Sequence, residues 1–358
     1  MRFLFLLVSM IVLFSQLIFS ESEYSFDLDE IEKKPYSFGG YLETRPVFDR
    51  DEEYNAKLQL DGSYEKEIAK IYTKINFDMQ ESHLGWSDTT SILEGYLSLK
   101  PSSSLNINIG KKALKWGKGY AWTPVAFFDR TKNPDDPDLA LEGFIGLSAD
   151  YTKSYSGALK TISFTPVLLP VYDNINDEFG ETDKLNFGGK LYLLLYDTDI
   201  DFIMLADGSK TSRYGFDFSR NITSNFEIHG EFAFVNEYDA KSYLFGIRYL
   251  TKLDTTFIVE SYHNDTRFTD GEMNPTRDYL YARISQKEPF DILYFTPSIT
   301  GIVNTNDKSF SLSPELLYTG ITNLELRLKT TFFSGQSNSE YGEKYNDYKI
   351  ELMARYYF

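Results

Sequence analysis

Apolar and polar side chains alternate along most of the chain from Tyr36 to the last residue. The final segment shows the pattern clearly, with apolar side chains at every second position: Ile350, Leu352, Ala354, Tyr356 and Phe358. The charged residues Lys349, Glu351 and Arg355 stand between them. Successive side chains of a β-strand point to opposite faces, so this period of two predicts strands with one apolar and one polar face.

The alternation recurs often enough to predict eighteen strands. Their ranges are 36–48, 54–65, 68–79, 90–100, 104–112, 141–152, 157–168, 185–196, 199–206, 211–220, 225–236, 241–251, 255–263, 277–286, 291–303, 308–318, 322–333 and 346–358. The segments near 157, 199 and 255 are the weakest, and a count of 16 strands remains an alternative. Either number is even, as in bacterial transmembrane barrels.

The connections between these segments fall into two groups. One group is tight, for example 65–67, 101–103, 197–198 and 252–254, whereas the other contains the longer stretches 80–89, 113–140, 169–184, 264–276 and 334–345. Short turns at one end and long loops at the other are typical of outer-membrane barrels. We therefore predict an all-β fold, a transmembrane antiparallel up-and-down barrel with short periplasmic turns and long external loops.

Composition separates this barrel from the other classes of similar length. Aromatic residues make up 16% of the chain, and many stand at segment ends, as in the interfacial girdles of membrane barrels. A mean hydropathy of −0.34 excludes a bundle of transmembrane helices. A soluble sandwich of this size would usually divide into smaller domains, but no composition break follows residue 36. We expect one barrel domain over 36–358.

The N-terminus predicts export. Residues 1–20 carry one early cation, Arg2, and an apolar stretch that ends at Ser20, which is the pattern of a secretory signal peptide; an uncleaved anchor helix is the alternative. Residues 21–35 form an acidic lead-in. The lack of cysteine excludes disulfides, thiolate metal sites and a lipoprotein anchor. The formal net charge of −17 argues against a nucleic-acid partner.

The last three residues, Tyr356, Tyr357 and Phe358, end an alternating segment. This end resembles the C-terminal signal of Gram-negative outer-membrane proteins. The resemblance implies insertion by the barrel-assembly machinery into an outer membrane of phospholipid and lipopolysaccharide.

The longest connection, 113–140, differs in composition from a solvated loop. It contains two of the three tryptophans, Trp116 and Trp122, together with Tyr120, Phe127 and Phe128. Large apolar rings left in water would be unfavourable, so we expect this loop to fold into the barrel. A lid packed on its own aromatic residues outside the barrel is the alternative.

The same connection would be the third external loop. Its sequence from Gly110 through Trp116-Gly117 to Asn133-Pro134 is similar to a loop motif of porin-like channels, in which a glycine and a cation precede Trp-Gly and Asn-Pro follows. The resemblance implies a loop that constricts a pore. The Pro-Glu-Phe-Gly-Gly signature of general trimeric porins is missing. We predict that the constriction is formed by Lys112, Lys115, Trp116, Asp129 and Arg130.

Charges on the polar faces of the strands predict a wet interior. The predicted lumen-facing cations are Lys70, Lys74, Arg248, Arg283, Arg327, Lys329 and Arg355. Such residues on the lipid face would cost a few kcal/mol each near the midplane. The acids at 135, 136 and 138 could offer oxygen ligands to calcium, but solvated turn residues are the more ordinary interpretation. We predict no metal site and no cofactor.

The three histidines, His83, His229 and His263, are the candidates for a catalytic role. His263 lies between Ser261 and Asp265, the residue types of a nucleophilic triad, but the sequence gives no sign that the three converge. We predict that the chain is not an enzyme.

These features together predict an outer-membrane, porin-like channel for passive diffusion of small polar or anionic solutes. The alternative is a closed structural or assembly barrel whose external loops bind a partner or a surface polysaccharide; an outer-membrane hydrolase is a further one. The sequence allows either a homotrimer or a monomer.

Overall fold

The computed structural model describes residues 34–137, 139–236, 239–265, 268–269, 272–273 and 277–358. The predicted signal peptide and most of the acidic lead-in lie outside these residues. Eighteen strands form one sheet: β1 (Tyr36–Phe48), β2 (Glu52–Lys66), β3 (Ala69–Ser82), β4 (Gly85–Ser102), β5 (Leu105–Lys112), β6 (Phe144–Ser154), β7 (Leu159–Val171), β8 (Lys184–Leu195), β9 (Thr198–Leu205), β10 (Arg213–Thr223), β11 (Phe226–Val235), β12 (Ala240–Leu250), β13 (Thr255–Asn264), β16 (Arg277–Gln286), β17 (Phe295–Asn304), β18 (Ser309–Ile321), β19 (Leu324–Ser334) and β20 (Tyr348–Tyr357).

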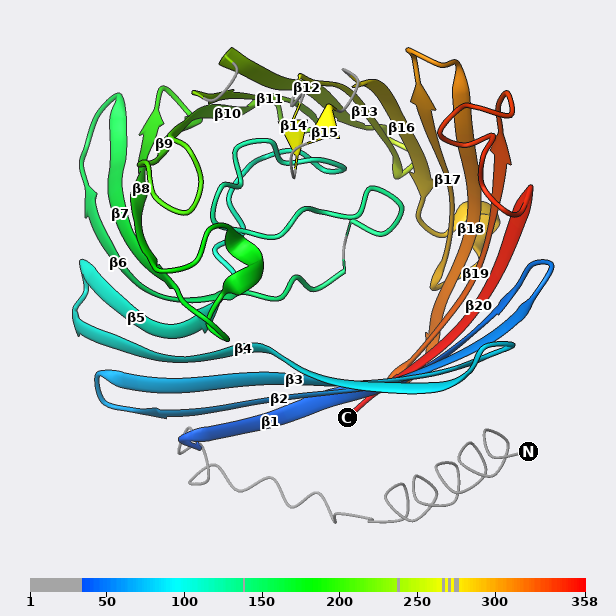
Figure 1. The fold of residues 1–358 in the computed structure, drawn as a ribbon, viewed down its shortest axis with the longest axis horizontal. Coiled ribbons are helices and arrows are strands. Elements are labelled where there is room, and N and C mark those ends of the chain that lie inside the picture. The colour runs from blue at the N-terminus through cyan, green and yellow to red at the C-terminus, as the bar shows by residue number, and fades with distance from the viewer. Residues whose placement is uncertain (1–33, 138, 237–238, 266–267, 270–271, 274–276) are drawn as a thin grey trace.

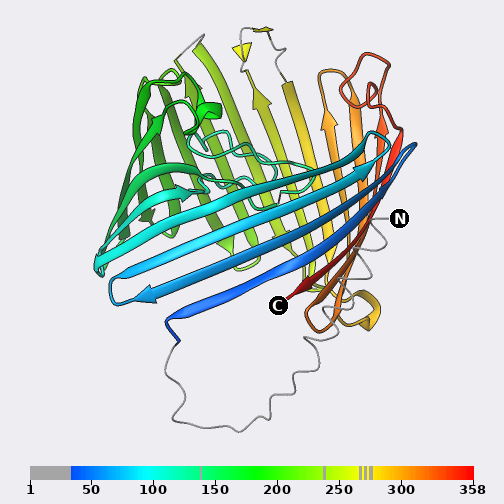
Figure 2. The same ribbon diagram turned by 60° about the horizontal axis from the view of Figure 1, so that its bottom comes forward.

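The sheet closes into a barrel because its first and last strands pair. Each strand is antiparallel to its neighbours in sequence, and β1 pairs with both β2 and β20, with Tyr41 opposite Tyr357. Gly40 and Phe358 exchange two backbone hydrogen bonds of 3.1 Å at this seam. Figure 1 looks down the resulting ring, and Figure 2 shows the inclined strands from the side. A closed sheet leaves no unpaired edge.

The predicted all-β antiparallel barrel of eighteen strands is confirmed, and each of the eighteen predicted ranges overlaps one strand. The three segments with the weakest predicted alternation, near 157, 199 and 255, form the separate strands β7, β9 and β13. The alternative of 16 strands is therefore wrong. The predicted long loop at 80–89 is also wrong. There β3 and β4 form a tight hairpin in which Ser82 pairs with Gly85. This end of β4 was not predicted, because the polar residues around Ser87 lack the apolar alternation that indicates a strand.

The two faces of the wall differ as the alternation requires. In β12 the side chains from Ala240 to Gly246 alternate between buried and exposed. Exposed apolar side chains cover the outer face, for example Phe245, Ile284 and Ile299. The inner face carries charged and polar side chains, several fully buried, among them Asp201, Asp217 and Glu260. Among the described residues, no helix has the length and apolar character needed to cross a bilayer.

The barrel has a short-turn end and a long-loop end. At the short-turn end, β8 and β9 are joined by residues 196–197, β10 and β11 by 224–225, and β18 and β19 by 322–323. At the long-loop end, the connections include 113–143, 172–183 and 335–347. A short 3₁₀ helix, η2 (Asp177–Phe179), lies in the second of these, and a two-strand hairpin of β14 (Phe268–Thr269) and β15 (Glu272–Met273) follows β13.

Candidate functional site: the segment inside the barrel

The connection 113–140 is called the inner segment below, and its described residues run inside the ring of strands in both views (Figures 1 and 2). Its apolar side chains belong to the hydrophobic clusters of the molecule. In the first cluster, Trp116, Val125, Phe127 and Phe128 contact buried side chains of neighbouring wall strands and of the 172–183 loop: Phe144, Val167, Leu169, Val171, Phe179, Ile203, Leu205 and Ala233. The Phe128 and Phe179 rings are stacked with centroids 6.2 Å apart.

A second cluster forms around Trp122. Its ring stacks on Tyr262 and Tyr279, with centroid distances of 5.1 and 5.3 Å, and it contacts Tyr281 edge-on. Tyr341, from the loop between β19 and β20, joins the same cluster. Full burial of one such large side chain stabilises by about 1.5–3 kcal/mol. The segment therefore packs against the wall over much of its length.

Two wall carboxylates hold the backbone of the inner segment. Glu231 on β11 accepts the amides of Lys118 and Gly119 at 2.6 Å and that of Val125 at 3.3 Å. Glu260 on β13 accepts the amides of Tyr120 and Ala121 at 2.5 and 2.8 Å. Hydrogen bonds to a charged acceptor are about twice as strong as neutral ones.

The path of the backbone at this contact requires glycine. Gly117 has a φ of +103°, and a Cβ there would lie 2.8 Å from Glu231 Oε1. At Gly119 a Cβ would lie 2.0 Å from the carbonyl oxygen of Trp122. Side chains at these two positions would push the segment off the carboxylates.

Glu260 is itself fixed by a buried histidine. His229 Nε2 lies 2.9 Å from Glu260 Oε1, and His229 Nδ1 lies 3.5 Å from Glu227 Oε1. The Tyr120 ring packs edge-on against His229, with centroids 5.2 Å apart. His229 and Glu260 thus connect β11 and β13 to the inner segment at Tyr120.

Asp129 closes the segment on itself. Its carboxylate accepts the amides of Leu114, Lys115 and Trp116 at 2.7, 2.9 and 3.0 Å. Burial raises the pKa of Asp129 above its ordinary 3.8, although the three amide bonds favour the charged form. The loop is thus cross-linked from within.

The far part of the segment reaches another region of the wall. Asp136 lies 4.0 Å from Arg45 on β1 and 3.7 Å from Arg327 on β19, and Lys329 donates to the carbonyl oxygen of Asp135 at 2.5 Å. The segment is therefore bonded both to β11 and β13 and to β1 and β19.

Asp136 thus has arginine partners, while Asp138, the third acid considered for calcium, lies outside the described residues. Among those that are described, no group of three or more His, Asp and Glu side chains is placed to hold a metal ion.

The five residues predicted for a constriction occupy different surroundings. Lys112 ends β5 with its Nζ 5.0 Å from the centre of the Tyr96 ring. Lys115 is exposed, while Trp116 is buried and Asp129 bonds to backbone amides, so these last two support the loop. Arg130 pairs with Glu142 at 3.5 Å and with Glu178, and its guanidinium lies over Phe144.

The cations predicted to face the lumen lie on the polar face of their strands, mostly beside acids. Arg355 bonds to Glu43 at 2.6 Å across the seam, and Arg283 and Arg327 lie 3.6 and 3.8 Å from Glu315. Arg248 lies 3.8 Å from Glu227, and Lys329 contacts the inner segment. Lys74 lies 6.0 Å from the centre of the Tyr72 ring, and Lys70 is two residues before Tyr72 on the same face of β3.

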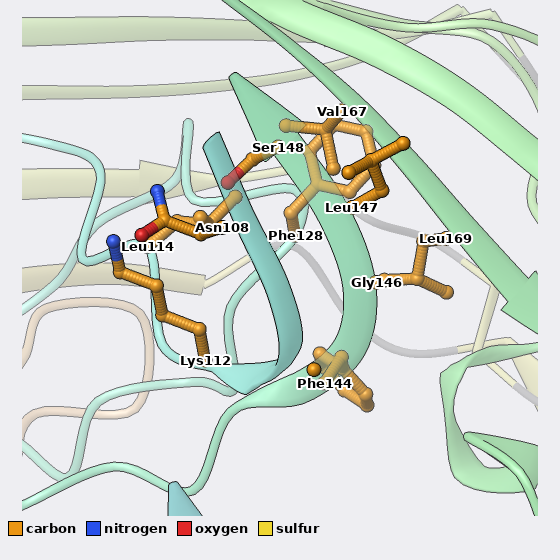
Figure 3. Close-up of a pocket in the computed structure, with 11 residues that line it drawn as sticks. Asn108, Lys112, Leu114, Phe128, Phe144, Gly146, Leu147, Ser148, Val167 and Leu169 are labelled. Atoms are coloured by element: carbon orange, nitrogen blue, oxygen red, sulfur yellow. The ribbon is translucent and has the colours of Figure 1, made fainter. Parts of the chain in front are cut away.

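One small cavity is lined in part by the inner segment, and another lies against the wall strands β1 to β4. Figure 3 shows the smaller one, about 20 Å³, with Asn108 and Lys112 from β5 and Phe128 from the inner segment at its lining; it has room for one water. The cavity against β1 to β4, about 150 Å³, is lined by both signs of charge, with Arg45 and Lys57 beside Glu43 and Asp78.

His263, the histidine beside Ser261 and Asp265 in the sequence, has an acidic partner on the neighbouring strand β16. His263 Nδ1 lies 2.6 Å from Asp278 on β16, and its ring stacks on Tyr243 with centroids 4.5 Å apart. His263 faces outward, because Glu260 faces inward and is three positions away on the same strand, where successive side chains alternate. Tyr243 and Asp278 are directly opposite His263 on the neighbouring strands and therefore face outward as well.

The wall partners of the inner segment cannot be predicted from the sequence. Glu231 and Glu260 are inward carboxylates like several others, and nothing local marks them as acceptors for amides more than a hundred residues away. The contributions of Phe179 and Tyr341 from two other loops were missed as well. Paired glycines at 117 and 119 were the one available signal of a close backbone approach.

Comparison with known proteins identifies the fold. No protein-family profile matches the sequence, and no curated protein matches it. Solved structures do match: the outer membrane protein OprD of Pseudomonas aeruginosa, with a TM-score of 0.61, 10% identity and coverage of 91% of this chain and 94% of that one, and OpdQ of the same organism, with 0.60, 11%, 92% and 99%.

Wzi of Escherichia coli, described as an outer membrane protein involved in group 1 capsule assembly and a carbohydrate-binding β-barrel, matches with a TM-score of 0.61, 11% identity and coverage of 90% and 84%. At such identities these likenesses show the shared barrel fold.

Proposed function

We propose that this chain is an outer-membrane channel for passive diffusion of small polar or anionic solutes, with the inner segment as its constriction. The observation that carries the proposal is the bonding of the inner segment to both sides of the wall, at Glu231 and Glu260 and again at Arg45 and Arg327. A loop held in this way across a wet interior narrows the passage without needing a moving part.

The membrane setting is part of the proposal. The outer face is apolar, and OprD, whose fold this chain shares, is described as an outer membrane protein. In lipid, a closed barrel satisfies all backbone hydrogen bonds internally. The predicted signal peptide and the aromatic C-terminus support export to the same place.

Selectivity would come from charges near the remaining space. Lys74 and Lys112 stand over the Tyr72 and Tyr96 rings, and in the part of the chain that the structure describes neither ammonium group lies within 4.0 Å of a carboxylate. Most other cations of the inner wall are paired with acids. Two cations without a close counter-ion would attract anionic solutes along β3 and β5.

Liposome swelling with solutes of equal size tests this proposal. We expect purified protein to admit small anionic and neutral polar solutes faster than cationic ones, and Lys74→Glu with Lys112→Glu to reverse the order of anion and cation. The pair Lys66→Glu with Lys153→Glu, at the short-turn end, changes charge equally and should leave the order unchanged. Vesicles that stay impermeable to all solutes would contradict the proposal.

A second candidate is a closed barrel that binds a surface polysaccharide at its long-loop end. The likeness to Wzi, described as a carbohydrate-binding barrel, favours it, as does the packing of Phe179 and Tyr341 onto the inner segment. Impermeable vesicles together with binding of the protein to an immobilised capsular polysaccharide would support this candidate over the channel.

A further inference from the structure

One connection at the short-turn end differs from the others in length and in exposure. Residues 287–294 join β16 to β17 and contain the 3₁₀ turn η4 (Pro289–Asp291). Four of its side chains are exposed and apolar: Phe290 at 93%, Ile292 at 49%, Leu293 at 62% and Tyr294 at 56%. The turns at 196–197, 224–225 and 322–323 have only two residues each. In Figure 2 the coil of η4 projects from the wall at this end.

The backbone of this turn is held in an unfavourable conformation. Glu288, Phe290, Asp291 and Tyr294 all have positive φ, between 49° and 61°, which side chains other than glycine seldom adopt. Internal bonds maintain it: Glu288 donates its amide to the carbonyl of Phe295 at 2.7 Å, and Glu288 Oε1 accepts the amide of Tyr294 at 2.9 Å. Backbone strain of this kind persists where the surroundings over-determine it and often accompanies a function.

The exposed side chains continue the apolar outer face of the barrel. Ile284 on β16 and Ile299 on β17 are opposite each other and half exposed on the outer face. Closer to the turn, Phe295 is opposite Tyr318. On the neighbouring side, the turn between β12 and β13 contacts this turn, because the Lys287 amide donates to the carbonyl oxygen of Asp254. Leu253 in that turn is 75% exposed. The exposed apolar side chains of 287–294 and Leu253, called the patch below, are thus continuous with the apolar outer face of the barrel.

We infer that the 287–294 turn is a membrane anchor, whose apolar side chains lie in the interfacial layer of the adjoining lipid leaflet. Aromatic and aliphatic side chains beside scattered charges suit the boundary between headgroups and acyl chains. Lys252 and Lys287 stand beside the patch, where their amines can meet lipid phosphates. The anchor would extend the apolar belt on this side of the barrel and fix its depth. This inference rests on the membrane setting proposed above, but not on an open channel.

Site-directed fluorescence tests it, because the chain has no cysteine. We would place single cysteines by Phe290→Cys, Ile284→Cys and Ser224→Cys, label each with an environment-sensitive dye, and reconstitute the full chain in phospholipid vesicles. Ile284 reports on the outer wall, and Ser224 lies in a polar turn at the same end. Lipids with a nitroxide on the upper acyl chain quench dyes in the bilayer, and iodide quenches those in water.

We expect the dye at 290 to show a blue-shifted emission, quenching by nitroxide lipid as strong as at 284, and weak quenching by iodide, with the opposite result at 224. A dye at 290 that behaves like the one at 224 overturns the anchor and leaves the turn as a water-exposed surface for a protein partner. If the dye at 284 also escapes the nitroxide, the membrane setting itself fails, and the anchor fails with it.

Discussion

Glu231 and Glu260 are the residues on which the position of the inner segment depends most directly. Together they accept five backbone amides from residues 118–125. Buried amides that lose an acceptor cost about 1–3 kcal/mol each. Their effect is therefore larger than that of the surface ion pairs elsewhere on the barrel.

The first prediction concerns Glu231→Ala, which leaves three amides unbonded. We expect the free energy of unfolding in urea to fall by at least about 3 kcal/mol. As a control, Glu325→Ala removes a partly exposed inward carboxylate whose ion pair with Arg355 is long, at 3.7 Å. This variant should lower the free energy of unfolding by less than about 1 kcal/mol. Equal losses in the two variants would show that the amide contacts do not hold the segment.

A pH effect is expected at Asp129, because burial raises its pKa above 3.8. Between 3.8 and the raised value, the folded chain holds a proton that the unfolded chain has released, so this residue makes stability fall as pH rises through that window. In Asp129→Asn this contribution is absent. Urea midpoints from pH 4 to 6 should therefore decline less steeply in the variant than in the wild type, with Asp177→Asn, in an exposed turn, as the control. Parallel curves would contradict the assignment.

At the scale of elements, the inner segment is stable because its aromatic side chains are buried between it and the wall. Trp122 and Trp86 provide a comparison within one residue type: Trp122 is 8% exposed in the second cluster, and Trp86 is 43% exposed at the start of β4. The two other loops contribute through Phe179 and Tyr341, so the long-loop end is a packed assembly of three connections.

Truncation of these two tryptophans gives the third prediction. Trp122→Ala should destabilise the protein by about 3–5 kcal/mol, because it leaves a cavity among Tyr262, Tyr279 and Tyr281. Trp86→Ala should cost about 1 kcal/mol or less. Unfolding in urea, followed by circular dichroism, measures both. A loss at Trp86 as large as that at Trp122 would mean that the cluster is not the stabilising contact.

The sequence predicted elements better than the contacts between them, for a physical reason. The inward position of Arg327 or Arg355 follows from the period of two along a single strand. By contrast, the contact of Lys118 with Glu231 joins residues 113 positions apart, and only the closure of the barrel brings them together. The end of β4 around Ser87 could not be predicted, because its polar residues lack the apolar alternation by which strands are recognised.

At the scale of the whole molecule, closure between β1 and β20 makes a single wall with an apolar outside and a charged inside. The inner segment crosses this interior and is bonded at both sides. We propose that the inner segment leaves a passage beside it and sets the width of that passage.

Single-channel recording in planar bilayers tests whether the inner segment leaves a passage and sets its width. Purified, folded wild-type protein should give discrete openings, and a variant lacking 115–138 should give larger ones, since removing the segment widens the passage. Heat-modifiable migration in gels serves as the control that both barrels are folded. Folded wild-type protein without openings, or a deletion variant whose conductance equals that of the wild type, would contradict the account.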